Sequence, residues 1–148
     1  MSKTIKHTLF YSHAPEIVWE YLTKAELIEQ WLMKSDFLPV VGHEFKFHTR
    51  QLPQFDFDGN VYCKVLEVVP QKKLIYSWKG GPRPGDINMD SIVKWILIPK
   101  DNGTELQLEH SGLIEHAGIF QAMNEGWLKN IKKIDELINT ALHGTTHP

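Results

Sequence analysis

Hydrophobic and polar residues alternate near the start of the chain, along residues 4–12 (TIKHTLFYS), which predicts a first strand. Two segments with apolar residues every three or four positions follow, at residues 14–22 (APEIVWEYL) and 23–32 (TKAELIEQWL). This spacing is typical of amphipathic helices, and the proline of the first segment suits the first turn of a helix. In the second segment, Thr23 and Glu26 have the spacing of a capping box. We therefore expect one strand followed by two short helices.

The middle of the chain consists of short segments with alternating hydrophobic and polar residues, the pattern of strands with one buried face. We expect such strands at residues 42–50, 59–70, 72–78, 90–99 and 103–110. The last two are joined by a turn in which Asn102 and Gly103 tolerate positive φ. In the final strand Leu106, Leu108 and His110 share one face, so this face should meet the core.

Two connections between these strands are longer than a tight hairpin needs: residues 49–59 (TRQLPQFDFDG) and 79–90 (KGGPRPGDINMD). Proline, glycine and aspartate are frequent in both. Long loops in compact domains often bind ligands or act as lids, but others are surface hairpins without a role. The sequence leaves both interpretations open.

Residues 124–138 (NEGWLKNIKKIDELI) have the apolar stripe of an amphipathic helix. We expect this helix to run from about Ile119 to Leu142, which makes it roughly 36 Å long. Gly126 interrupts the helix at a cost of about 1 kcal/mol relative to alanine, which suggests a close approach of the sheet or the short helices. Trp127 should then point into the space between the helix and the sheet.

This order of elements predicts an α+β fold, in which a curved antiparallel sheet of about six or seven strands wraps around the last helix. The chain has 148 residues, which suits one domain and suffices to bury a core without metals or disulfides. We expect residues 1–148 to form a single domain with a disordered tail at residues 143–148.

Composition and charge mainly exclude certain kinds of function and structure. The net charge of -2 and the pI near 6.4 provide no basic surface for nucleic acid. No apolar segment reaches membrane-spanning length, so we expect no membrane insertion. Cys63 is the single cysteine, which excludes an intrachain disulfide. We expect a soluble, cytoplasmic protein that is a monomer or a weak homodimer.

Four segments carry a family resemblance: residues 14–31 (APEIVWEYLTKAELIEQW), 65–78 (VLEVVPQKKLIYSW), 103–113 (GTELQLEHSGL) and 124–138. Together they resemble the START-related helix-grip superfamily (SRPBCC), and within it the single-domain homologues of the activator of heat-shock-protein-90 ATPase. The resemblance implies a hydrophobic cavity between the long helix and the curved sheet. It implies no shared chemistry, because the superfamily includes lipid carriers, hormone receptors, cyclases and hydrolases.

The wall of such a cavity should combine inward residues of the strands with the inward face of the long helix. We expect it to contain Trp78, Trp95, Leu108, His110, Met123, Trp127 and Ile131. Apolar walls with few polar groups are typical of small-molecule sites. The alternative is that these aromatic residues are ordinary core, which is the default for an aromatic stripe.

Glu67 and His110 are the candidates for catalysis. Glu67 has the strand parity of Val61, Cys63 and Val65, so it should face the core unless a bulge intervenes. A buried carboxyl group has a raised pKa and would suit an acid–base pair with His110. The alternative for His110 is a core histidine whose hydrogen bonds are satisfied by its neighbours.

Metal and cofactor sites find no support in the sequence. The 8 histidines lack the spacing of zinc ligands, and no residues next to Cys63 would activate it as a nucleophile. A glycine-rich phosphate loop that opens a helix is also missing. We therefore expect no metal and no cofactor.

Three functions remain open. The first is the binding of a small apolar or amphipathic molecule in the cavity, and the second is an enzyme that uses Glu67 and His110. The third is a partner of a chaperone or regulator. The eukaryotic activator has a further domain that engages the chaperone, and 148 residues leave no room for it. We therefore expect no chaperone-activating role.

Overall fold

The computed structural model describes residues 3–114 and 118–143, with only the backbone for residues 142 and 143. Its elements, in chain order, are β1 (Lys3–Tyr11), α1 (Pro15–Thr23), α2 (Ala25–Trp31), β2 (Lys34–Ser35), β3 (Glu44–His48), the 3-10 helix η1 (Pro53–Phe55), β4 (Asn60–Val69), β5 (Lys73–Gly80), β6 (Met89–Lys100), β7 (Gly103–Leu113) and α3 (Ile119–His143). The tail predicted to be disordered is residues 143–148, and its residues 144–148 lie outside the described residues.

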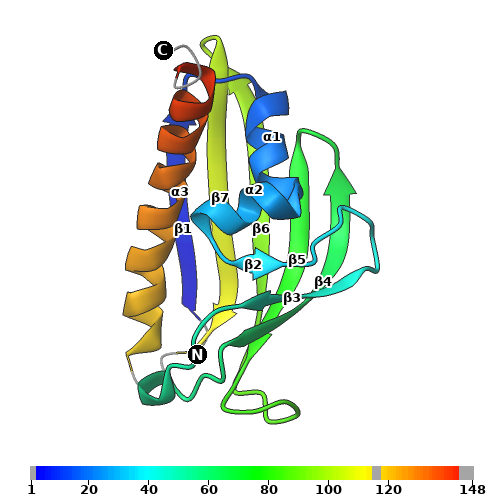
Figure 1. The fold of residues 1–148 in the computed structure, drawn as a ribbon, viewed down its shortest axis with the longest axis vertical. Coiled ribbons are helices and arrows are strands. Elements are labelled where there is room, and N and C mark those ends of the chain that lie inside the picture. Colours follow the sequence, from blue (N-terminus) through cyan, green and yellow to red (C-terminus); the bar gives the residue numbers. More distant parts are fainter. Residues whose placement is uncertain (1–2, 115–117, 144–148) are drawn as a thin grey trace.

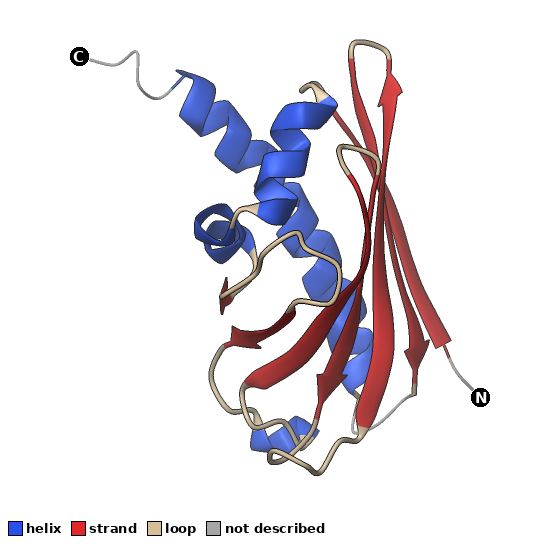
Figure 2. Ribbon diagram, turned by 90° about the vertical axis from the view of Figure 1, so that its right-hand side faces the viewer, coloured by secondary structure: helices blue, strands red, loops and turns tan. Residues whose placement is uncertain are grey.

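The strands form one seven-stranded sheet in the order β1-β7-β6-β5-β4-β3-β2, and every neighbouring pair is antiparallel. The three α-helices lie on one face of this sheet, which curls around them (Figure 2). The long helix α3 runs beside β1, with α1 and α2 packed against it (Figure 1). The structure thus confirms the predicted α+β helix-grip fold, including the two short helices after the first strand.

The core lies between α3 and the sheet. The helix contributes the predicted stripe of Trp127, Ile131, Ile134 and Ile138, all at most 3% exposed. The sheet contributes alternate residues of its longer strands, and in β7 every second residue from Thr104 to His110 is buried. The spacing of hydrophobic residues in α3 and in β7 therefore identified the buried face of each element correctly.

The hairpin between β6 and β7 differs by one residue from the predicted turn. Its two loop residues are Asp101 and Asn102, with φ of 49° and 62°, and Gly103 is already the first residue of β7. Gly103 is needed for another reason, because a Cβ there would lie 2.2 Å from the carbonyl oxygen of Tyr11. The glycine allows β1 to approach the start of β7.

The predicted capping box of the second helix is wrong. Thr23 ends α1, and its hydroxyl donates a hydrogen bond of 2.7 Å to the carbonyl of Trp19. Lys24 occupies the N-cap of α2, where no side chain caps the helix. The chain bends at Lys24, so the hydroxyl of Thr23 is used by the helix that precedes it.

Candidate functional site

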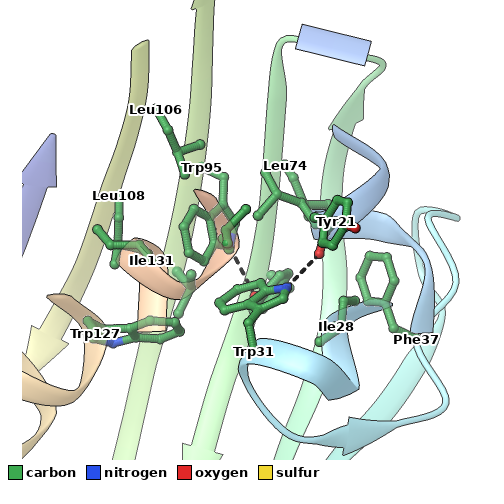
Figure 3. Close-up of a cluster of buried hydrophobic side chains, with 14 of the residues drawn as sticks. Tyr21, Ile28, Trp31, Phe37, Leu74, Trp95, Leu106, Leu108, Trp127 and Ile131 are labelled. Atoms are coloured by element: carbon green, nitrogen blue, oxygen red, sulfur yellow. Dashed lines mark hydrogen bonds between the residues drawn. The ribbon is translucent and has the colours of Figure 1, made fainter. Parts of the chain in front are cut away.

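Five of the seven predicted wall residues are packed in the core. Trp95, Leu108, His110, Trp127 and Ile131 are at most 3% exposed, and none of them lines the main cavity described below. Figure 3 shows Ile131 on α3 close to Trp95 and Leu108 of the sheet. The alternative interpretation of these residues, ordinary core, describes their position.

Tryptophan side chains fill this core in a continuous chain. Trp31 of α2 packs edge-on against Trp95, with ring centroids 5.8 Å apart, and Trp95 packs against Trp127 at 5.6 Å (Figure 3). Trp127 in turn contacts Trp78, with centroids 5.2 Å apart. Such large rings leave little space beneath α3, so any cavity must lie beyond the last of them, Trp78.

His110 belongs to a buried chain of hydrogen bonds. Trp127 Nε1 donates to His110 Nδ1 at 3.0 Å, so the proton of the neutral ring is on Nε2. His110 Nε2 then donates to Ser91 Oγ at 2.8 Å, and Ser91 Oγ donates to the carbonyl of Trp78, also at 2.8 Å. Burial lowers the pKa of His110 from 6.5 to about 3. The imidazole is therefore a neutral structural group that links α3 to the sheet.

A cavity of about 230 Å³ lies beyond Trp78, and we call it the loop cavity. One wall is the start of α3, where Met123 and Ala122 face it. The other walls come from the two long connections, residues 49–59 and 79–90. Of the predicted wall residues, Trp78 and Met123 line this cavity, and its surface is mostly apolar.

Hydrogen bonds fix the two loops that form these walls. In the first loop, Leu52 and Phe57 exchange backbone hydrogen bonds of 2.9 and 3.2 Å and close a turn around η1. Asp58 N then donates to Gly81 O of the second loop at 2.8 Å. Within that loop, a Cβ at Gly81 would lie 1.9 Å from Asp86 O, so only glycine fits. Both loops therefore have defined backbones and form cavity walls, rather than being loose surface hairpins.

The polar groups of the loop cavity lie at its rim. Thr49, Asp56 and Asn88 are exposed residues that border it. The amide of Asn88 donates to the carbonyl of Asp56 at 3.4 Å and joins the two loops at this point. This arrangement shields an apolar body from water and offers hydrogen bonds to a polar end.

A second, smaller space lies beside Gly126, and we call it the Gly126 hollow. It has a volume of about 120 Å³ and is open toward the surface. Outside the adjoining residues and backbone of α3 itself, no heavy atom lies within 4 Å of a Cβ built at Gly126, so the predicted close approach to the sheet or the short helices is wrong. Trp127 points into the core as expected, whereas its neighbour Gly126 faces this hollow, which lies between α3 and the residues that follow α2.

The structure does not bring Glu67 and His110 together. A bulge lies between Val65 and Glu67 and reverses the strand parity, so Glu67 pairs with Ile75. Glu67 faces away from the core and forms an ion pair of 3.0 Å with Lys73, with 45% of its side chain exposed. The two candidates for catalysis are therefore not an acid–base pair, and the bulge that the sequence left open is the reason.

Cys63 is a buried thiol on the inward face of β4. Burial raises its pKa, so the thiolate that a nucleophile requires is disfavoured. Within residues 3–114 and 118–143, no group of three or more histidine, cysteine, aspartate or glutamate side chains could hold a metal ion.

Sequence reasoning missed several residues of the loop cavity. Leu52 and Phe57 are apolar residues within a polar loop, and this contrast was the signal that could have identified them. Met33 follows α2 and Met89 begins β6, and their patterns look like those of any partly buried residue. Only the packing of the loops against α3 makes these four residues neighbours.

Comparison with known proteins identifies the family. The family described as activator of Hsp90 ATPase homolog 1-like protein matches residues 12–139. The chain belongs to this family. This membership agrees with the resemblance found in the sequence. A separate search of curated proteins returned no match.

One solved structure supports this membership, and two more distant ones share the fold. Protein MLL2253 from Mesorhizobium loti is 34% identical, with 93% of this chain and 97% of that chain covered and a TM-score of 0.79. The Aha1 dimer from Colwellia psychrerythraea is 21% identical, with 90% and 94% covered and a TM-score of 0.73. DynU16, a protein in the dynemicin biosynthetic locus, is 18% identical with a TM-score of 0.75. The match covers 93% of this chain but 48% of DynU16, and the last two comparisons show the fold alone.

Like these neighbours, the described part of the chain combines one curved sheet with a long covering helix. None of its described helices is both long enough and apolar enough to cross a membrane.

Proposed function

We propose that this member of the activator of Hsp90 ATPase homolog 1-like family binds a small apolar molecule in the loop cavity. The observation that carries the proposal is an apolar space of about 230 Å³ whose loop walls are fixed by hydrogen bonds. Preformed apolar clefts with a few polar groups are the usual form of small-molecule sites. Trp78 and Met123 would contact the ligand, while the core residues behind them hold α3 and the sheet in place.

The volume of the cavity limits the ligand. A cavity of about 150 Å³ accepts benzene, and drug-sized ligands occupy clefts of about 300–1,000 Å³. At about 230 Å³, the loop cavity suits a molecule of one or two rings, or a chain of similar bulk. A phospholipid or a sterol would not fit without opening the loops.

Cavity filling provides the test. Ala122 is an exposed residue of α3 whose side chain lines the cavity, so Ala122→Phe should fill it without disturbing the core. Ala141→Phe is the matched control, because Ala141 is an exposed residue near the other end of the same helix. Indole, 1-naphthol and 1-octanol are suitable probes, and binding is measured by thermal shift and by quenching of tryptophan fluorescence.

We expect at least one probe to raise the Tm of the wild type and of Ala141→Phe, and to leave Ala122→Phe unchanged. Binding with similar affinity to all three proteins would place the site elsewhere. If no probe shifts the wild type, the proposal fails.

Binding to a Hsp90-type chaperone is a second candidate, suggested by the name of the family. The observation that favours it is an exposed apolar segment before β3, where Leu38, Val40 and Val41 are 54%, 58% and 61% exposed. A pull-down with the chaperone should retain the wild type and lose a Val40→Asp, Val41→Asp double variant. Failure to retain the wild type at micromolar protein would reject this candidate.

The oligomeric state and the cytoplasmic location stay predictions. The Colwellia psychrerythraea neighbour is described as a dimer. For this chain we expect a monomer or a weak homodimer, and sedimentation equilibrium over a range of protein concentrations measures it. A dimer that persists at nanomolar concentration would contradict this expectation.

A further inference from the structure

Gly126 lies inside a long helix, yet no close contact explains it. At Gly103 and Gly81 a Cβ would collide with a backbone oxygen, at 2.2 and 1.9 Å. At Gly126 a Cβ would have no atom of another element within 4 Å, and its φ is not in the left-handed region that favours glycine. Glycine is a poor helix former, so the helix itself gains nothing from it. The absence of a side chain at Gly126 leaves the adjacent hollow unfilled.

The space beside Gly126 adjoins the proposed ligand site. The Gly126 hollow and the loop cavity share three lining residues: Met33, Trp78 and Met123. Trp78 is the fixed member of the three, because it is 6% exposed and packs against Trp127. Met33 and Met123 are only partly buried. Methionine side chains are unbranched and flexible, so these two can rotate without disturbing the core.

We propose that the loop cavity and the Gly126 hollow are two ends of one site for an elongated apolar molecule, and that Gly126 keeps the far end open. This inference rests on the proposed function, which it deepens by naming the ligand class and a residue that determines its length. The ligand is an alkyl chain or a similarly narrow apolar molecule, with its polar end at the rim near Thr49 and Asn88. Its body passes Trp78 between the two methionines, and its tail ends beside Gly126.

A homologous series of probes tests this geometry. Straight-chain 1-alkanols from hexanol to dodecanol vary in length alone, and 1-naphthol is a compact probe that fits the loop cavity by itself. Tryptophan fluorescence reports binding, because Trp78 and Trp127 line the Gly126 hollow. Gly126→Leu fills the hollow. Asn139→Leu, at an exposed position of the same helix, is the matched control.

In the wild type and in Asn139→Leu, each added methylene should raise alkanol affinity about three- to fourfold until both spaces are full, the equivalent of about 0.8 kcal/mol per buried methylene. In Gly126→Leu this gain should stop at a shorter chain, while 1-naphthol binds as in the wild type. Should Gly126→Leu fail to fold, Gly126→Ala replaces it, with a higher Tm than the wild type and a reduced gain for the longest chains.

Two results would overturn the inference. The first is the same dependence on chain length in the wild type and in the Gly126 variant. The second is binding of 1-naphthol without any gain along the alkanol series, and either result leaves the proposed function intact. If neither 1-naphthol nor any alkanol binds the wild type, the proposed function and this inference both fail.

Discussion

The hydrogen bonds around His110 predict a stability that falls in mild acid. In the folded protein the ring is neutral, because its Nδ1 accepts from Trp127 and its burial lowers the pKa from 6.5 to about 3. In the unfolded chain the same ring has its ordinary pKa and takes up a proton below about pH 6.5. The unfolded state therefore binds more protons, and the stability contribution is lost as the pH falls from 6.5 toward 3.

The magnitude follows from the two pKa values. Between pH 7 and pH 5, protonation of His110 in the unfolded chain alone should lower the free energy of unfolding by about 2 kcal/mol. Any folded-state pKa below about 4 gives the same result, because the folded ring is then still neutral at pH 5. With typical urea m-values, the unfolding midpoint should fall by about 1 M.

The assay is urea unfolding, followed by tryptophan fluorescence, at pH 7 and pH 5 for the wild type and for His110→Gln. Glutamine has hydrogen-bonding groups but does not titrate, so the variant has the pH dependence of all other groups. The wild type should lose about 2 kcal/mol more than the variant between these two pH values. Equal losses would show that the folded ring takes up a proton as readily as the unfolded one, and the assignment of His110 as a neutral structural group would be refuted.

Three further changes test the fold around the site. Gly103→Ala should lower the free energy of unfolding by about 1–3 kcal/mol in urea melts, because its Cβ would lie 2.2 Å from the carbonyl oxygen of Tyr11; an unchanged midpoint would contradict the close approach of β1. Tyr11→Phe removes a buried hydrogen bond from the hydroxyl to the carbonyl of Ile131 and should cost about 1 kcal/mol, whereas a stability gain would argue against this contact. Glu67→Gln removes a half-exposed ion pair with Lys73 and should change stability by less than about 1 kcal/mol, without affecting the binding of any probe; a loss of binding would return Glu67 to the site.

The sequence by itself determined the elements and their buried faces. Side chains three or four apart share a helix face and alternate residues share a strand face, so Ile131 and Ile134 had to lie on one side of α3. Leu106 and Leu108 had to lie on one side of β7 for the same reason. Both faces are buried in the structure. The long connections were also visible as polar interruptions between strands, and both became walls of the loop cavity.

One extra residue in β4 reversed the orientation that strand parity predicts for Glu67. The bulge between Val65 and Glu67 leaves Leu66 unpaired and moves Glu67 to the outer face of the sheet. A bulge depends on the register of the neighbouring strand, which a local pattern does not contain. For this reason the sequence left the orientation of Glu67 open.

The position of the cavity was decided by the tertiary structure alone. The residues of the inward stripe look alike in the sequence, but Ile131 is packed beneath the tryptophan rings and Met123 borders a cavity. Similarly, a glycine within a helix shows that a side chain is missing, but not whether a backbone or an empty space lies opposite. At Gly126 it is a hollow formed by α3, Trp78 and the residues that follow α2. Whether space remains beside a residue depends on the volumes of side chains that are distant in the sequence, and these meet only when the chain folds.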